Sequence, residues 1–390
     1  MVKGQVWHRK REYNQRFKVG KFDTWREIKR AKSSPSAQIY TGERVSAQND
    51  FFYSVWKEIQ QPDLSRFLNT SHSPPRREIF QVHEVLVQLK SLSSGSAGPD
   101  ELSPRLLKSS RLEIAMAATK LFNRCIAESI MPQQWRDANI TPVGKVRNPQ
   151  NCEDFRPIAI TSALCKVFER ILAKRIIASS QSIWLKNKQF GFLPSRCTMD
   201  AVIQVIEDWS HAKDQKTAVF SFFFDFSKAF DLVDHEVLLE KLIKLKLEPW
   251  LISWLAAYLT GRRQCVKCGN ITSEWADVEA GVIQGSVLGP ILFILFISDI
   301  NEFIPAGVEI EKYADDILAY ITFKSASDLG TIPQQIADGV EKWCAINKMR
   351  LNPSKCKVLL VNPSSQPDTA LSLSLSLPTL SGLPVEVVSS

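Results

Sequence analysis

The sequence predicts a fold of the α+β class, in which helices and strands are mixed along the chain. Two runs have the apolar and β-branched or aromatic character of strands, AVFSFFFDF at 218–226 and EIEKYADDILAYI at 309–321, and acidic residues interrupt both. Other segments space their apolar residues as helices do, for example SALCKVFERILAKRII at 162–177. With 390 residues, 44% of them hydrophobic, the chain can bury a substantial core.

Segments rich in proline, glycine and serine divide the chain into four regions. Proline in SHSPPRRE predicts a linker near 71–78, and the loop SSGSAGPDELSP follows the first helix of the main region. We expect a basic arm over 1–32, a connecting region over 33–75, a folded domain over 76–362, and a disordered or degenerate Ser/Leu/Pro-rich tail over 363–390. Helices are expected at 77–92, 106–130, 162–185, 200–212, 227–245, 291–300 and 332–349, hairpins at 135–160, around 265–268 and at 309–321, and a last strand after the turn at 350–355.

Charge is concentrated at the start of the chain. Residues 1–32 contain eleven Lys or Arg and three acidic residues, an excess of eight that equals the net charge of the whole chain. Such an arm suits a polyanion, either nucleic acid or an anionic membrane surface, and it equally suits a solvated leader without a partner. The first 30 residues lack the apolar segment of a secretory signal, and the longest apolar run, VLGPILFILFI at 287–297, is too short to span a bilayer. We therefore expect a protein of the nucleus or cytoplasm that is not secreted and has no transmembrane segment.

Three carboxylates carry the clearest chemical signal. Asp225 ends the first apolar strand, and Asp315 and Asp316 interrupt the second. If the two strands pair, the three side chains meet, and their mutual repulsion favours a bound divalent cation. Carboxylate oxygens suit Mg²⁺, and two such ions can support nucleotidyl transfer. A solvated polar turn is the alternative, because adjacent aspartates are common in hairpin turns.

Six sequence blocks in a fixed order favour the metal site over the solvated turn. They are FRPIAITSALCKVFERIL (155–172), QFGFLPSRCTMDAV (189–202), FFDFSKAFDLVDHEVLLEKL (223–242), GVIQGSVLGPILF (281–293), YADD (313–316) and LNPSKCKVLL (351–360). Together they resemble the reverse transcriptase of non-LTR retrotransposons, the LINE-like or jockey-type elements. The resemblance covers roughly residues 76–362 and implies a right-hand polymerase fold with fingers and palm. Family chains continue into a helical thumb, which we expect to be missing here.

The resemblance implies a role for each matching residue. Asp225, Asp315 and Asp316 would be catalytic and would bind two Mg²⁺ ions, or Mn²⁺ in their place, with the backbone of Phe226 as a further metal contact. Phe230 would be the steric gate that rejects a 2′-hydroxyl. The remaining candidates would bind the nucleotide (Arg156, Gln284, Gly285, Lys355 and Lys145) or the template (Arg196).

Plainer interpretations stand beside several of these roles. Phe230 could belong to the core, Arg156 could cap a neighbouring helix, and Asp231 and Asp234 are expected to serve a helix N-terminus rather than a metal. Cys265 and Cys268 have zinc-site spacing but no second pair, so free thiols are expected.

The chain also departs from the family pattern. Ile283 stands where proline is usual before QGS, and Leu193, Ser195 and Cys197 replace the usual Arg, Gly and Ser. These changes put the Gln284 turn and the nucleic-acid contacts of the 189–202 block in question.

The expected function is therefore an RNA-directed DNA polymerase core that joins dNTPs to a DNA primer on an RNA template. A truncated, catalytically impaired remnant that binds nucleic acid is the alternative. An RNA-templated RNA polymerase is a third, and Phe230 argues against it.

Overall fold

The computed structural model describes residues 41–56, 59, 62–68, 78–186, 188–362 and 377–388. The basic arm over 1–32 lies outside the described residues, so the expectation for it stays untested. The connecting region contributes two helices, α2 (Gly42–Tyr53) and α3 (Ser65–Leu68). No helix within the described residues combines the length and the apolar character needed to cross a membrane.

The main sheet brings together the two acidic strands. Its strand order is β12-β9-β3-β8-β7, which begins at the edge with β12 (Glu386–Val388). β3 (Ala218–Phe224) is the central strand, and β7 (Glu309–Tyr313) and β8 (Asp316–Phe323) form the expected hairpin. β3 pairs antiparallel with β8 on one side and with β9 (Lys357–Val361) on the other. The proposed pairing of 218–226 with 309–321 is thus a pairing of neighbouring strands.

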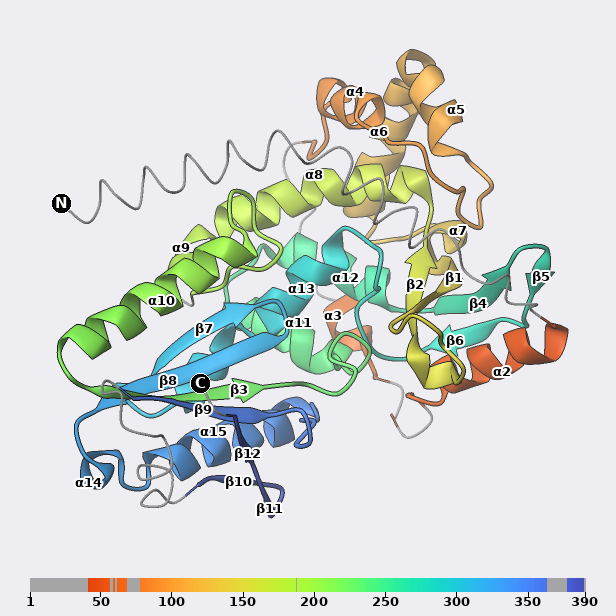
Figure 1. The fold of residues 1–390 in the computed structure, drawn as a ribbon. Helices are drawn as coiled ribbons and strands as arrows, with labels where there is room; N and C mark the ends of the chain where they lie inside the picture. Colours follow the sequence, from red (N-terminus) through yellow and green to blue (C-terminus); the bar gives the residue numbers. More distant parts are fainter. Residues whose placement is uncertain are drawn as a thin grey trace, which may run out of the picture. The chain divides into compact units, whose positions relative to one another are not determined.

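Helices lie on both faces of this sheet (Figure 1). On one face, α10 (Thr198–Asp214) packs against Val219 and Tyr320 in a small cluster of its own. On the other, Phe220, Phe222 and Phe224 belong to the main core with α15 (Ile332–Asn347) and α13 (Leu288–Phe296). The alternation of β3 separates its side chains into these two sets, and Phe223, which faces the α10 side, stays 37% exposed.

A second sheet carries the FRPIAI block. β1 (Asp137–Gly144) and β2 (Phe155–Ile160) form the antiparallel hairpin that the sequence predicts, with the short helix η1 (Cys152–Asp154) in its connection. β1 also pairs in parallel with β4 (Arg262–Cys268). β4 in turn pairs antiparallel with β5 (Ile271–Thr272) and β6 (Ala276–Val278). Cys265 and Cys268 lie on β4 as free thiols.

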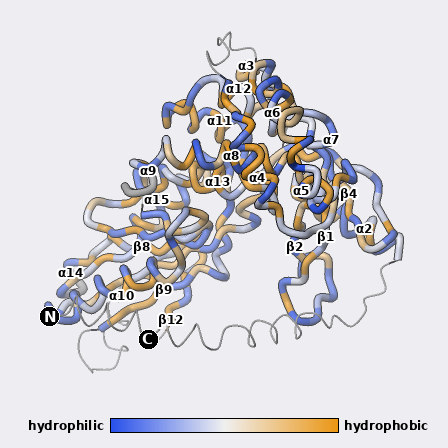
Figure 2. Tube along the Cα trace, turned by 90° about the horizontal axis from the view of Figure 1, so that it is seen from above, coloured by the Kyte–Doolittle hydropathy of each residue, from blue (hydrophilic) through white to orange (hydrophobic). Residues whose placement is uncertain are grey.

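A helical group joins the two sheets. Figure 2 shows α8 (Ala163–Ser179), α11 (His235–Lys244), α12 (Pro249–Leu259) and α13 close together, with hydrophobic segments among them. Every residue of α12 from Leu251 to Leu259 is buried, and so is nearly all of α13, because helices that are apolar on all sides have no face for solvent. The remaining helices within the described residues are α4 (Val82–Lys90), α5 (Pro104–Ser109), α6 (Arg111–Ala127), α7 (Gln133–Arg136), α9 (Gln181–Lys186), η2 (Ser298–Phe303) and α14 (Ala326–Leu329).

The structure corrects the predicted helices at 106–130, 162–185 and 227–245. The first two are each broken once, at Ser110 and at Ser180. The segment at 227–245 was expected to be helical throughout, yet α11 begins at His235 and residues 227–232 form turns. Lys228 is in the left-handed region, with φ of 49°, which ends any helix that starts earlier. The Asp234 carboxylate accepts a hydrogen bond from Val237 N, so it caps α11 as expected.

Part of the tail is ordered. Within 363–390, residues 377–388 hold the short strands β10 (Thr379–Leu380), β11 (Leu383–Pro384) and β12 (Glu386–Val388). β12 adds to the main sheet in parallel with β9, and Leu380 and Val385 are buried in the main core. These residues differ from the expected disordered tail because an open sheet edge and core surface are available to them.

Candidate functional site

The sheet places the three catalytic candidates at one end of two paired strands. Phe224 and Ile317 are the last pair of the β3–β8 ladder, so Asp225 and Asp316 leave the sheet side by side. Directly opposed residues of an antiparallel pair have Cα atoms about 4.5–5.5 Å apart. By alternation Asp225 points to the same side as the exposed Phe223, away from the main core.

The turn that holds Asp315 is braced from outside the hairpin. Tyr313 pairs with Asp316, which leaves Ala314 and Asp315 as a two-residue turn with Ala314 left-handed at φ of 59°. The buried Gln189 Oε1 accepts hydrogen bonds from Ala314 N (3.1 Å) and Gly191 N (2.7 Å). A Cβ on Gly191 would lie 2.3 Å from Ala314 N, so only glycine allows this close approach. The QFGF block thus fixes the YADD turn.

Repulsion among the acids appears in their pKa values. Burial raises the pKa of Asp315, and the charge of Asp225 raises it further. Burial also raises the pKa of Asp316, to which the charges of Asp315 and Asp225 add. On the other side, Lys355 Nζ lies 3.9 Å from Asp225 Oδ2. A divalent cation bound between these acids would offset their mutual repulsion.

The side chains as placed do not enclose a metal ion. Across the part of the chain that the structure describes, no group of three or more His, Cys, Asp or Glu side chains is arranged to hold one. The donor types and the strand placement fit Mg²⁺, which accepts carboxylate and water oxygens together. Because Asp225 and Asp316 are neighbours across the ladder, side-chain rotation would bring their oxygens together without a change of fold.

A cavity of about 900 Å³ connects Asp225 and Asp315 with a basic wall. Its lining includes seven cationic residues, four of which, Lys145, Arg156, Lys228 and Lys355, form the basic wall; the other three are Arg136, Arg262 and Arg263. Burial lowers the pKa of Lys145, and the neighbouring charges of Arg156 and Lys355 lower it further. Within the described residues the Arg156 guanidinium makes no hydrogen bond or ion pair, although it lines the cavity. A cluster of cations that repel one another creates a site for a polyanion.

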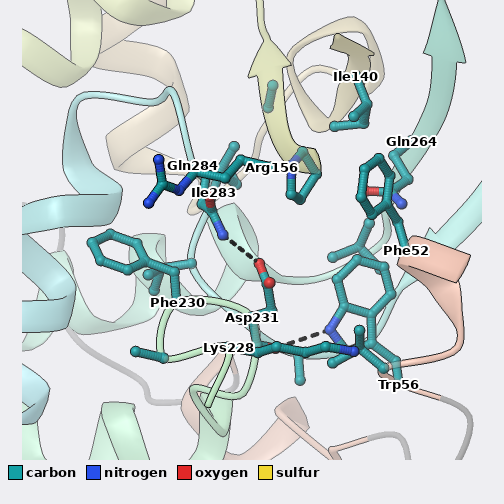
Figure 3. Close-up of a pocket in the computed structure, with 18 of the residues that line it drawn as sticks. Phe52, Trp56, Ile140, Arg156, Lys228, Phe230, Asp231, Gln264, Ile283 and Gln284 are labelled. Carbon is teal, nitrogen blue, oxygen red and sulfur yellow. Dashed lines mark hydrogen bonds between the residues drawn. The ribbon is translucent and has the colours of Figure 1, made fainter. Parts of the chain in front are cut away.

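The QGS turn is pinned at several points despite Ile283. Gln284 O accepts a hydrogen bond from Ala159 N at 2.7 Å, and Gln284 Nε2 donates to Asp231 Oδ1 at 2.8 Å (Figure 3). Gly285 has φ of 115°, and a Cβ there would lie 2.5 Å from Ala159 O. These contacts hold the turn where proline is absent.

Phe230 lies between the cavity and the core. Its ring stacks on Phe293 at 4.6 Å and meets Phe192 edge to face at 6.0 Å. It is partly exposed and lines the cavity, near Arg156 and Gln284 in Figure 3. The ring is therefore rigidly backed while one side remains open to a ligand.

Three sequence candidates lie apart from the cavity lining, namely Asp316, Gly285 and Arg196. Arg196 donates from Nη1 to Gln189 O at 2.6 Å, and its guanidinium lies over the Phe190 ring. This side chain thus supports the same segment that braces the YADD turn. Lys145 lines the cavity and also donates to Glu153 O.

Sequence reasoning missed several residues of the site. Lys228 lines the cavity from the DFSKAFD block, and Phe52 and Trp56 line it from the connecting region. Asp231 was assigned to a helix N-terminus, but Asp234 has that role and Asp231 holds Gln284. The signal available for Asp231 and Lys228 was their place in the block that starts at Asp225.

Comparisons with known proteins give the family. A family model described as "Reverse transcriptase (RNA-dependent DNA polymerase)" matches residues 145–376. The probable RNA-directed DNA polymerase from transposon BS of Drosophila melanogaster is 30% identical over 286 residues, which cover 71% of this chain and 31% of that protein. The corresponding X-element protein of the same species is 30% identical over 326 residues, 82% of this chain and 36% of that one. The enzyme from mobile element jockey of Drosophila funebris is 28% identical over 284 residues, 71% of this chain and 31% of that one.

The chain spans about a third of the length of these curated relatives. Among solved structures, an apo telomerase from Candida tropicalis, truncated from its C-terminal domain, superposes with a TM-score of 0.42 and 14% identity over 61% of this chain and 52% of that one. The match of the family model covers more than half of the chain and includes the acidic strands, the QGS turn and most of the basic wall. This chain belongs to the reverse transcriptase family.

Proposed function

We propose that the chain is the fingers and palm core of an RNA-directed DNA polymerase from a non-LTR retroelement. The observation that carries this proposal is the single cavity that joins Asp225 and Asp315 to Lys145, Arg156, Lys228 and Lys355. Nucleotidyl transfer needs both features, since acids must hold the cations and a basic wall must receive the triphosphate.

Within this proposal, Asp225, Asp315 and Asp316 would hold two Mg²⁺ ions, with the Phe226 backbone as a further contact. The ions would activate the primer 3′-hydroxyl and neutralise the leaving pyrophosphate. Lys355, beside Asp225, would balance the charge of the acids before substrate binds and contact phosphate afterwards. The protein's own contribution is positioning and charge complementarity.

The nucleotide would be held from three sides. Arg156 would form a forked contact with phosphate oxygens, since its guanidinium has no competing partner within the described residues. Phe230 would close the space at the sugar 2′ position, backed by Phe293. Gln284 and Gly285 would pack against the base pair, and Arg196 would contact the template with donors that Gln189 leaves free.

The second candidate is a nucleic-acid-binding remnant without catalysis. One observation favours it, the arm at 1–32 with its excess of eight positive charges. The arm would supply affinity that falls steeply with salt and does not depend on base sequence.

Primer extension separates the two candidates. The purified protein is incubated with poly(rA), an oligo(dT) primer, dTTP and Mg²⁺, alongside Asp315→Asn and the matched control Asp214→Asn. Asp214 is exposed at the end of α10 and does not line the cavity. The polymerase proposal expects extension by the wild type and by Asp214→Asn, and none by Asp315→Asn. No extension by the wild type, together with salt-sensitive binding of the primer–template, would support the remnant instead.

A further inference from the structure

Asp231 is an acidic residue on the wall of a basic cavity. Its carboxylate faces the cavity and accepts one hydrogen bond, from Gln284 Nε2 to Oδ1. Burial raises the pKa of Asp231 to about 6. Among the described residues Asp231 makes no ion pair, although the positive charges of Lys228 and Lys145 lower its pKa by electrostatic attraction at longer range. Burying a charged carboxylate costs desolvation free energy, which points to a structural role that Asp231 serves at this place.

The backbone of Asp231 is fixed on several sides. Trp56 Nε1 donates to Asp231 O at 2.9 Å (Figure 3), and Asp231 N donates to Lys228 O at 2.9 Å. Gly281 lies so close that a Cβ on it would be 2.8 Å from Asp231 O. The carboxylate therefore stands on a rigid support, to which the connecting region contributes through Trp56.

Gln284 needs such a support at its side chain. Its carbonyl is anchored to Ala159 N, which leaves the side chain free to rotate. An ionised carboxylate only accepts hydrogen bonds, so it must face the amide NH₂ group and not the amide oxygen. Asp231 thereby determines which way the Gln284 amide is turned as well as where it lies.

We propose that Asp231 is a positioning residue that fixes the place and the orientation of the Gln284 amide for the incoming nucleotide. This inference rests on the proposed function, since it assigns a task within the same site. Asp231 acts through Gln284, so its loss should weaken nucleotide binding more than it slows the transfer step.

The test compares three single variants in the primer-extension reaction. Asp231→Leu removes the acceptor, Asp231→Asn keeps an acceptor oxygen in the same place, and Asp214→Asn is the matched control. Loss of one charge-assisted hydrogen bond predicts a KM for dTTP raised roughly tenfold in Asp231→Leu, with a smaller change in kcat. We expect Asp231→Asn to recover most of the loss and the control to match the wild type.

A double-mutant cycle shows whether the effect runs through Gln284. In the Gln284→Ala background, Asp231→Leu should raise the KM no further, because the group that it positions is already gone. A role confined to local stability would instead lower the urea midpoint and act on the KM equally in both backgrounds. That additive result would overturn the proposal, as would a KM unchanged in Asp231→Leu.

A binding assay separates failure of the polymerase proposal from failure of the positioning proposal. It measures the Kd of fluorescently labelled dTTP for the complex of protein, template–primer and Mg²⁺. If the wild type binds dTTP without extending the primer, the polymerase proposal fails while the positioning proposal is still judged by the same cycle on Kd. Asp231→Leu should then weaken dTTP binding roughly tenfold in the wild-type background alone. Equal affinity of Asp231→Leu and the wild type would overturn the positioning role.

Discussion

Glu169 is a fully buried carboxylate that caps the N-terminus of α13, a helix distant from it in the sequence. It lies on α8, and its Oε2 accepts hydrogen bonds from Val287 N (2.6 Å) and Leu288 N (3.0 Å). Its Oε1 accepts from Cys165 Sγ and Tyr258 Oη. Glu169 therefore supplies the anion at the N-terminus of α13, the helix that follows the QGS turn.

The cost of removing this carboxylate follows from those contacts. Glu169→Leu leaves two buried N–H groups without an acceptor, each worth about 1–3 kcal/mol, so the loss is roughly 2–6 kcal/mol. Burying the leucine side chain recovers roughly 1.5–3 kcal/mol. From the midpoints of these two ranges we expect a net destabilisation of about 2 kcal/mol.

Glu169→Gln keeps an amide oxygen at the position of Oε2 and an NH₂ group opposite Tyr258 Oη and Cys165 Sγ, both of which can accept. Only the charge at the helix end is lost, at about 1 kcal/mol.

Urea unfolding followed by circular dichroism measures both variants, with Glu113→Gln as a control because Glu113 is exposed on α6. The expected order of stability is control and wild type, then Glu169→Gln, then Glu169→Leu. A Glu169→Leu variant within about 0.5 kcal/mol of the wild type, the usual range of surface changes, would refute the reasoning. Equal losses in both variants would show that the charge matters and that the unsatisfied N–H groups do not.

Three further predictions concern the site and its support. Phe230→Ala should admit a 2′-hydroxyl, so the preference for dTTP over UTP in kcat/KM should fall about 10–100-fold, and an unchanged preference would remove the steric-gate role. Gln189→Leu frees the N–H of Ala314 and displaces the catalytic turn, so kcat should drop by roughly 10²-fold with a smaller change in the KM for dTTP. Burial lowers the pKa of His235, whose Nε2 bonds to Gly281 O, so the unfolded chain takes up this proton more readily than the folded one. The unfolding free energy should therefore fall as the pH drops below about 6.5, by at most about 1.4 kcal/mol per pH unit from this group, and His235→Gln should reduce that dependence.

The sequence by itself determined much of the local structure. Local residue patterns predicted the β1–β2 and β7–β8 hairpins, the apolar strand β3 and the helices α8, α10, α13 and α15, because these patterns depend on residues close together in the chain. The order of the blocks gave Asp225, Asp315 and Asp316 as the chemical centre and Arg156 and Phe230 as its neighbours, and the structure places Asp225, Asp315, Arg156 and Phe230 around one cavity.

Tertiary structure alone decided which side chains support that centre. Asp231 meets Gln284 across 53 positions, Glu169 meets Val287 across 118, and Gln189 meets Ala314 across 125. Each of these polar side chains reads in the sequence as a surface or capping residue, since neighbours in the chain give no sign of burial. Their roles arise only when the fold brings an unpaired backbone N–H or a mobile amide within about 3 Å, where leaving it unsatisfied would cost more than burying the partner.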